Sequence, residues 1–106
     1  MNENAEKTLL VDGKVVLPHR SLAVVNHSPD GFNWGYGGSG PAQTTLAILL
    51  ECTSEIEALS YYQDYKREVI ASIPQEQSVL SITSKEVEQW LSSKREDKRR
   101  EGKEIL

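Results

Sequence analysis

The sequence predicts one small α+β domain, and three observations support this class. The length of 106 residues suits a single hydrophobic core. Short apolar runs typical of strands come first and recur near residue 80, and two longer apolar-rich segments typical of helices lie between them. The expected order is β-β-β-α-α-β-α, with four strands in an antiparallel or mixed sheet and three helices. The domain is expected to cover residues 1–93, and residues 94–106 a charged C-terminal tail or helical extension.

Four segments have the pattern of strands. The first two, at about 7–11 and 14–17, flank Asp12-Gly13, a dipeptide that tolerates the positive φ angles of a tight hairpin turn. The third, SLAVVN at 21–26, is a β-branched apolar run of the length of a buried strand. The fourth, SVLSI at 78–82, alternates apolar and polar residues.

Three segments have the signals of helices. Pro41 suits the first position of a helix because that position needs no N–H and proline already has a helical φ. Ser54 with Glu57, and Thr83 with Glu86, have the three-residue spacing of a capping box. The expected helices cover residues 41–52, 55–73 and about 84 onward.

Charge and composition exclude several function classes. The net charge is −4, and residues 1–93 carry 12 acidic and 6 basic side chains, which argues against a broad nucleic-acid footprint. The longest apolar run, LAILL at 46–50, is far too short to cross a membrane. The N-terminus lacks the apolar stretch of a signal peptide, so a cytoplasmic protein is expected. One cysteine and two distant histidines predict no disulfide, no metal site and no cofactor.

The segment HSPDGFNWGYGGSGPAQ at 27–43 holds the candidate site. It contains five of the seven glycines and three of the seven aromatic residues, and it leads directly into a helix. Glycines let backbone N–H groups converge, and the start of a helix adds unpaired N–H groups and a positive dipole end, which suits an anion. Alternating aromatic side chains suit stacking on a base. The expected ligand is therefore a small phosphorylated, nucleotide-like molecule. The candidate ligand-binding residues are Arg20, His27, Asp30, Phe32, Asn33, Trp34, Gly35, Tyr36, Gly37, Gly38, Ser39, Gly40, Gln43 and Thr44.

Other interpretations of this segment remain open. A hydrolase or transferase would use His27 as general base, Asp30 to orient it, and Ser28 or Ser39 as nucleophile. A protein-interaction module would use the aromatic loop against a host protein. The glycines and Pro41 can also serve only to shape a tight strand-to-helix elbow, with Phe32 and Trp34 as core caps over the sheet. GYGGSG at 35–40 fits GxGxxG but lacks the strand–turn–helix setting of a dinucleotide site, and no P-loop pattern is present.

The string SPDGFNWGYGGSGPAQ, followed by an aliphatic helix, resembles the signature of an uncharacterised small-domain family encoded by bacteria, plasmids and phages. The resemblance covers roughly residues 8–91. Phage-borne domains that look like this in size include sponges that sequester nucleotide immune signals, such as cyclic dinucleotides and cyclised ADP-ribose derivatives. The family signature itself names no activity. The analogy to sponges suggests an anti-defence role by ligand capture without turnover, at the interface of a symmetric homo-oligomer.

Overall fold

Three short strands form one mixed sheet in the computed structural model, which describes residues 7–28 and 31–105. Strand β1 (Thr8–Val11) lies in the centre, antiparallel to β2 (Lys14–Val15) and parallel to β3 (Val79–Ile82). Asp12 and Gly13 join β1 to β2 with φ angles of 53° and 80°. Both values are those of the type I′ turn that matches the twist of a hairpin, so the predicted hairpin is confirmed.

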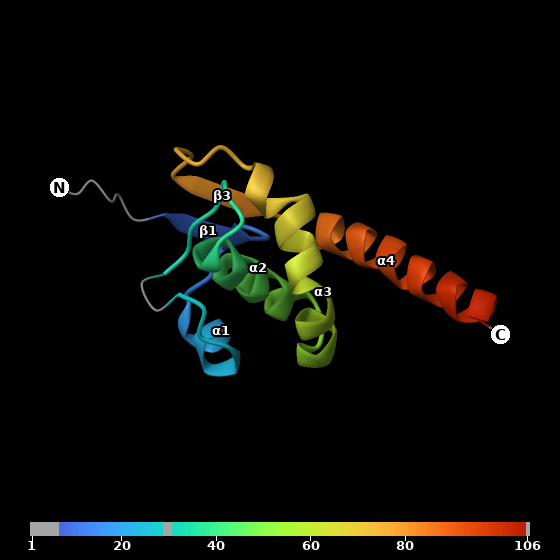
Figure 1. Cartoon of the computed structure of the whole chain (residues 1–106). Helices are drawn as coiled ribbons and strands as arrows, with labels where there is room; N and C mark the ends of the chain where they lie inside the picture. The colour runs from blue at the N-terminus through green and yellow to red at the C-terminus, as the bar shows by residue number, and fades with distance from the viewer. Residues whose placement is uncertain (1–6, 29–30, 106) are drawn as a thin grey trace.

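Helices cover one side of this sheet. Helix α2 (Ser39–Cys52) is central, because every residue from 40 to 50 is buried. It packs on β1 and on helix α3, as Figure 1 shows. A helix that is buried on all sides can be apolar on all sides, which explains the LAILL run within it. The other helical elements are α1 (His19–Val24), α3 (Glu55–Glu68), the 3-10 turn η1 (Ile70–Ser72) and α4 (Ser84–Ile105).

The predicted strand at 21–26 is wrong, because most of this segment forms helix α1. Pro18 precedes the helix with φ −77° and ψ −14°, and its carbonyl accepts hydrogen bonds from the Leu22 N–H at 2.9 Å and the Ser21 hydroxyl at 3.0 Å. The proline therefore starts a helical turn that the β-branched composition did not suggest. This one change explains why the described residues contain three strands and four α-helices, where four strands and three helices were expected.

Helix α3 also differs from its prediction, because it ends at Glu68 and not near residue 73. Val69 leaves the helical conformation with φ −123°, and η1 follows. The Ile70 carbonyl then accepts a hydrogen bond from the Gly35 N–H at 3.1 Å. The early end of α3 thus gives the glycine-rich loop a backbone partner.

Helix α4 begins where its capping box predicts. The Thr83 N–H donates to the Glu86 carboxylate and the Glu86 N–H donates to the Thr83 hydroxyl, both at 3.1 Å. The helix then runs through the charged segment that begins at residue 94 and extends away from the sheet (Figure 1). Arg95 ties it to α3 by a two-point ion pair with Glu57, at 2.6 and 2.7 Å. Within the described ranges, no helix has the length and apolar character needed to cross a membrane.

Candidate functional site

An open groove of about 890 Å³ lies beside the β1–β2 hairpin. Residues 7–9 at the start of β1 line one part of it, and residues 15–18 after the hairpin turn line another. The glycine-rich segment contributes through Ser28, residues 31–33, Tyr36, Ser39 and Gly40, and the segment before β3 contributes through Gln75, Glu76 and Ser78. A groove of this volume is within the range of small-molecule sites.

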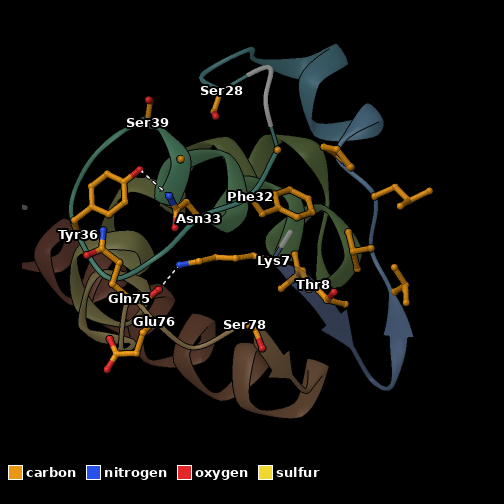
Figure 2. A pocket seen from close by; sticks show the side chains of 17 residues that line it. Lys7, Thr8, Ser28, Phe32, Asn33, Tyr36, Ser39, Gln75, Glu76 and Ser78 are labelled. Carbon is orange, nitrogen blue, oxygen red and sulfur yellow. Dashed lines mark hydrogen bonds between the residues drawn. The ribbon is translucent and has the colours of Figure 1, made fainter. Parts of the chain in front are cut away.

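Aromatic and apolar side chains form much of the groove. Phe32 lies in the middle of the view in Figure 2, close to Lys7 and Asn33. Tyr36 lies at the rim and is 39% exposed. Its hydroxyl accepts a hydrogen bond from the Asn33 side-chain amide at 3.3 Å. Two rings are therefore available to a ligand in the groove.

Lys7 supplies a positive charge to the same groove. Its ammonium group donates to the Gln75 carbonyl and lies 5.0 Å from the centre of the Trp34 ring. Burial lowers the pKa of Lys7, and the nearby Glu76 carboxylate acts in the opposite direction. An ammonium group has three N–H donors, so Lys7 can bind an anionic ligand while keeping its bond to Gln75.

The start of helix α2 lies at the edge of the groove. Gly38 is its N-cap and provides no side-chain cap. The next two residues, Ser39 and Gly40, both line the groove, and Pro41 has no N–H. Because the first N–H groups of a helix have no acceptor within the helix, those of Ser39 and Gly40 are donors suited to an anion.

Trp34, in contrast, does not belong to the groove surface. It is fully buried, and its indole N–H donates to the Gln77 carbonyl at 3.0 Å. The expected role of Trp34 as a stacking platform is therefore wrong, because no face of its ring is open to a ligand. The ring is part of the hydrophobic core and connects the loop to the segment before β3.

Gln43 and Thr44 are also core residues, although they were expected to face a ligand. Both are fully buried. Gln43 bonds to the backbone of His27 and of Val25, and the Thr44 hydroxyl accepts from the Asn33 N–H at 2.9 Å and lies 2.7 Å from the Asn33 carbonyl. Both side chains hold the loop onto α2, which leaves them no free groups for a ligand.

Three of the loop glycines are needed for close packing. Gly35 has φ +89°, and a Cβ atom there would lie 2.7 Å from the Gln75 Cα. A Cβ at Gly38 would lie 2.6 Å from the Tyr36 ring, and one at Gly40 would lie 2.7 Å from the Asn33 Cβ. Because these glycines have no Cβ, the Tyr36 ring can pack against Gly38 and the Gln75 backbone can pack against Gly35. Tyr36 and Gln75 both line the groove.

The residues of the catalytic interpretation are not brought together. The His27 Nε2 lies 2.7 Å from the Tyr62 hydroxyl on α3, while Ser28 and Ser39 line the groove and His27 does not. Asp30 lies outside the described residues. Arg20, on α1, lies 3.6 Å from Glu51 and is not part of the groove. In the described ranges, no three His, Cys, Asp or Glu side chains are arranged to hold a metal ion.

The groove therefore contains part of the predicted set and adds residues that the sequence did not indicate. The predicted residues that line it are Phe32, Asn33, Tyr36, Ser39 and Gly40, and those that do not are Arg20, His27, Trp34, Gly35, Gly37, Gly38, Gln43 and Thr44. The added residues include Lys7, Gln75 and Glu76. No local pattern marks these three, because contacts between distant segments bring them to the loop, among them the pairing of β1 with β3 and the hydrogen bond from Trp34 to Gln77.

These features define a small α+β domain that carries an open groove. A glycine-rich loop and the start of a helix form one side of this groove. The chain belongs to a family of unknown function, DUF6166, whose family model matches residues 2–93. No curated protein and no solved structure matches the chain.

Proposed function

We propose that the protein binds a small phosphorylated, nucleotide-like molecule in the groove. The observation that carries this proposal is that Phe32, Lys7 and the start of α2 line one groove. An aromatic ring suits the base, and an ammonium group with free helix N–H groups suits a phosphate. The sequence suggested a site in the loop alone. The proposed site is instead the space between the loop and the hairpin.

The charge of the groove supports a ligand with few negative charges. Among the described residues that line it, Lys7 is the only cation and Glu76 is an anion. A triphosphate would meet the Glu76 carboxylate with little positive charge to offset it. A monophosphate or a phosphodiester, including a cyclic nucleotide, fits this balance better.

Binding without chemical conversion is the favoured form of this function. His27, the candidate general base, does not line the groove, and its Nε2 lies 2.7 Å from the Tyr62 hydroxyl. Capture of a nucleotide signal, as in the sponge proteins that the sequence resembles in size, requires the groove and no nucleophile. This role in sequestration is part of the proposal.

A thermal-shift screen followed by calorimetry tests the proposal. The panel contains mononucleotides, cyclic mono- and dinucleotides, ADP-ribose compounds and a nucleoside triphosphate, and each hit is analysed for products. We expect a monophosphate or phosphodiester to stabilise the protein and to be recovered unchanged. Phe32→Ala should then weaken binding roughly tenfold or more, because base–aromatic stacking contributes about 1–3 kcal/mol.

Two matched variants distinguish the groove from the neighbouring surface. Lys7→Met removes the groove cation but keeps an unbranched side chain over Trp34, and it should weaken binding by about tenfold or more. Arg20→Met makes the same kind of change outside the groove and should leave affinity unaltered. A hit that is converted to product makes the protein an enzyme. A panel without hits, or binding that depends on Arg20 and not on Lys7, contradicts the proposal.

A further inference from the structure

Strand β2 lies at one edge of the sheet, and among the described residues no other strand pairs with its outer side. The Val16 N–H donates to the Leu9 carbonyl at 2.9 Å, and Val15 lies opposite Leu10 in the β1–β2 register. In an antiparallel pair, hydrogen-bonded and non-hydrogen-bonded positions alternate. The N–H and C=O groups of Val15 therefore point away from β1, and continued alternation turns those of Leu17 the same way.

The side chains at this edge are apolar and exposed. Val15 is 62% exposed and Leu17 is 58% exposed, whereas Val16 between them is buried against the core. Along these three residues the side chains alternate between exposed, buried and exposed, as expected for a strand with one face on the core. An exposed apolar edge with unpaired backbone groups is a template for pairing with another strand.

We propose that two copies of this chain pair through β2 in antiparallel register. The register that uses all four outward groups places Val15 opposite Leu17 of the second copy, and Leu17 opposite Val15 of the second copy. The twofold axis then passes at Val16. Four backbone hydrogen bonds form, and the two three-stranded sheets join into one six-stranded sheet.

The side chains favour a second copy as the occupant of this edge. In the stated register the exposed apolar side chains of the hairpin, Val15 and Leu17 from each copy, cover one another on the open face of the sheet. The edge lysine, Lys14, lies opposite Pro18 of the second copy and not opposite its own counterpart, so no like charges meet. Pro18 has no N–H, and α1 starts directly after it, so the pairing ends there.

The proposed interface adjoins the groove without depending on its function. Residues 15–17 line the groove and also form the paired edge. The second copy would therefore stand beside the groove, and each dimer would carry two grooves related by the twofold axis. The pairing can be measured without any ligand.

Size-exclusion chromatography with light scattering, over a series of protein concentrations, tests the pairing. The wild-type protein should have twice the mass of the chain and should dissociate on dilution. Val15→Pro removes only an N–H that points away from β1 and leaves the bond from Val16 to Leu9, so it should give a folded monomer. Leu17→Lys changes an exposed side chain and should also give a monomer.

Val79→Lys is the matched control, because Val79 is 45% exposed on β3, at the opposite edge of the same sheet. This variant should remain dimeric. Circular dichroism and thermal unfolding verify that each variant is folded. A wild-type protein that is monomeric at all concentrations overturns the proposal. So does a dimer that persists in folded Leu17→Lys, or one that Val79→Lys disrupts.

Discussion

The buried side-chain amide of Gln43 binds the backbone at His27, where the glycine-rich segment begins. Its Oε1 accepts hydrogen bonds from the N–H groups of His27 at 2.7 Å and Ser28 at 3.0 Å. Its Nε2 donates to the Ser21 hydroxyl at 2.9 Å and the Val25 carbonyl at 3.1 Å. All four hydrogen-bonding positions of this amide are therefore used to hold α1 and the loop onto α2.

Gln43→Leu should destabilise the protein by roughly 2–4 kcal/mol, because it leaves two backbone N–H groups and a carbonyl without partners. Urea unfolding measures the change. Gln89→Leu is the control, because Gln89 is exposed on α4, and this variant should stay within about 0.5 kcal/mol of the wild type. Equal effects of the two substitutions would contradict the structural role of Gln43.

Gly35→Ala should destabilise the protein by about 2–4 kcal/mol. Its φ of +89° is unfavourable for alanine, and the added Cβ would meet the backbone of Gln75 and Ile73 at 2.7–2.8 Å. Gly37→Ala is the matched control in the same loop, because a Cβ added there would have no neighbouring atom within 4 Å. Thermal unfolding of both variants should show a large loss for the first and little change for the second. A Gly37→Ala variant that loses as much stability would refute this interpretation of the loop.

Elements set by neighbouring residues are the ones that the sequence predicts well. Asp12-Gly13 forms the predicted turn, and Thr83 with Glu86 forms the predicted capping box. Both features depend on contacts within four residues of the chain. Helix α1 was missed because its β-branched residues suggest a strand, while a remote side chain, Gln43, holds it in place.

The candidate site was only partly predictable, because it too depends on contacts between residues that are far apart in the chain. The sequence shows that the loop is unusual, but it does not show which aromatic residue is buried. Trp34 packs in the hydrophobic core, where its N–H donates to the Gln77 carbonyl, and Phe32 lines the groove. Lys7 joins Gln75 and Glu76 in the groove because β1 pairs with β3 across about 70 residues of chain. Contacts of this kind leave no local signal.

The ion pair between Glu57 and Arg95 should make stability depend on pH in acid. Hydrogen bonds from Arg95 and, to a smaller extent, from Thr53 lower the pKa of Glu57 from 4.5 to about 2. Because the pKa is lower in the folded state, the pair stabilises the fold above about pH 4.5. This contribution is lost as the pH falls from 4.5 through 2.

Urea midpoints measured across this pH range test the ion pair. Glu57→Gln should lower the midpoint at neutral pH and should show a weaker loss of stability than the wild type between pH 4.5 and 2. Glu55→Gln, an exposed substitution on the same helix, should follow the wild-type curve. Parallel pH profiles for wild type and Glu57→Gln would show that the pair does not stabilise the fold.

Cys52 should react slowly with thiol reagents in the folded protein. Burial, together with the nearby Asp12, Glu51 and Glu88 carboxylates, raises the pKa of its thiol to about 11. The reactive thiolate is then roughly one part in ten thousand at pH 7, against a few per cent for a free cysteine. The rate of alkylation, followed by mass spectrometry, should rise about tenfold per pH unit until the pH approaches 11. Unfolding in urea should remove the protection of Cys52 from alkylation. Rapid alkylation of the native protein at neutral pH would instead mean that Cys52 is an accessible, activated thiol.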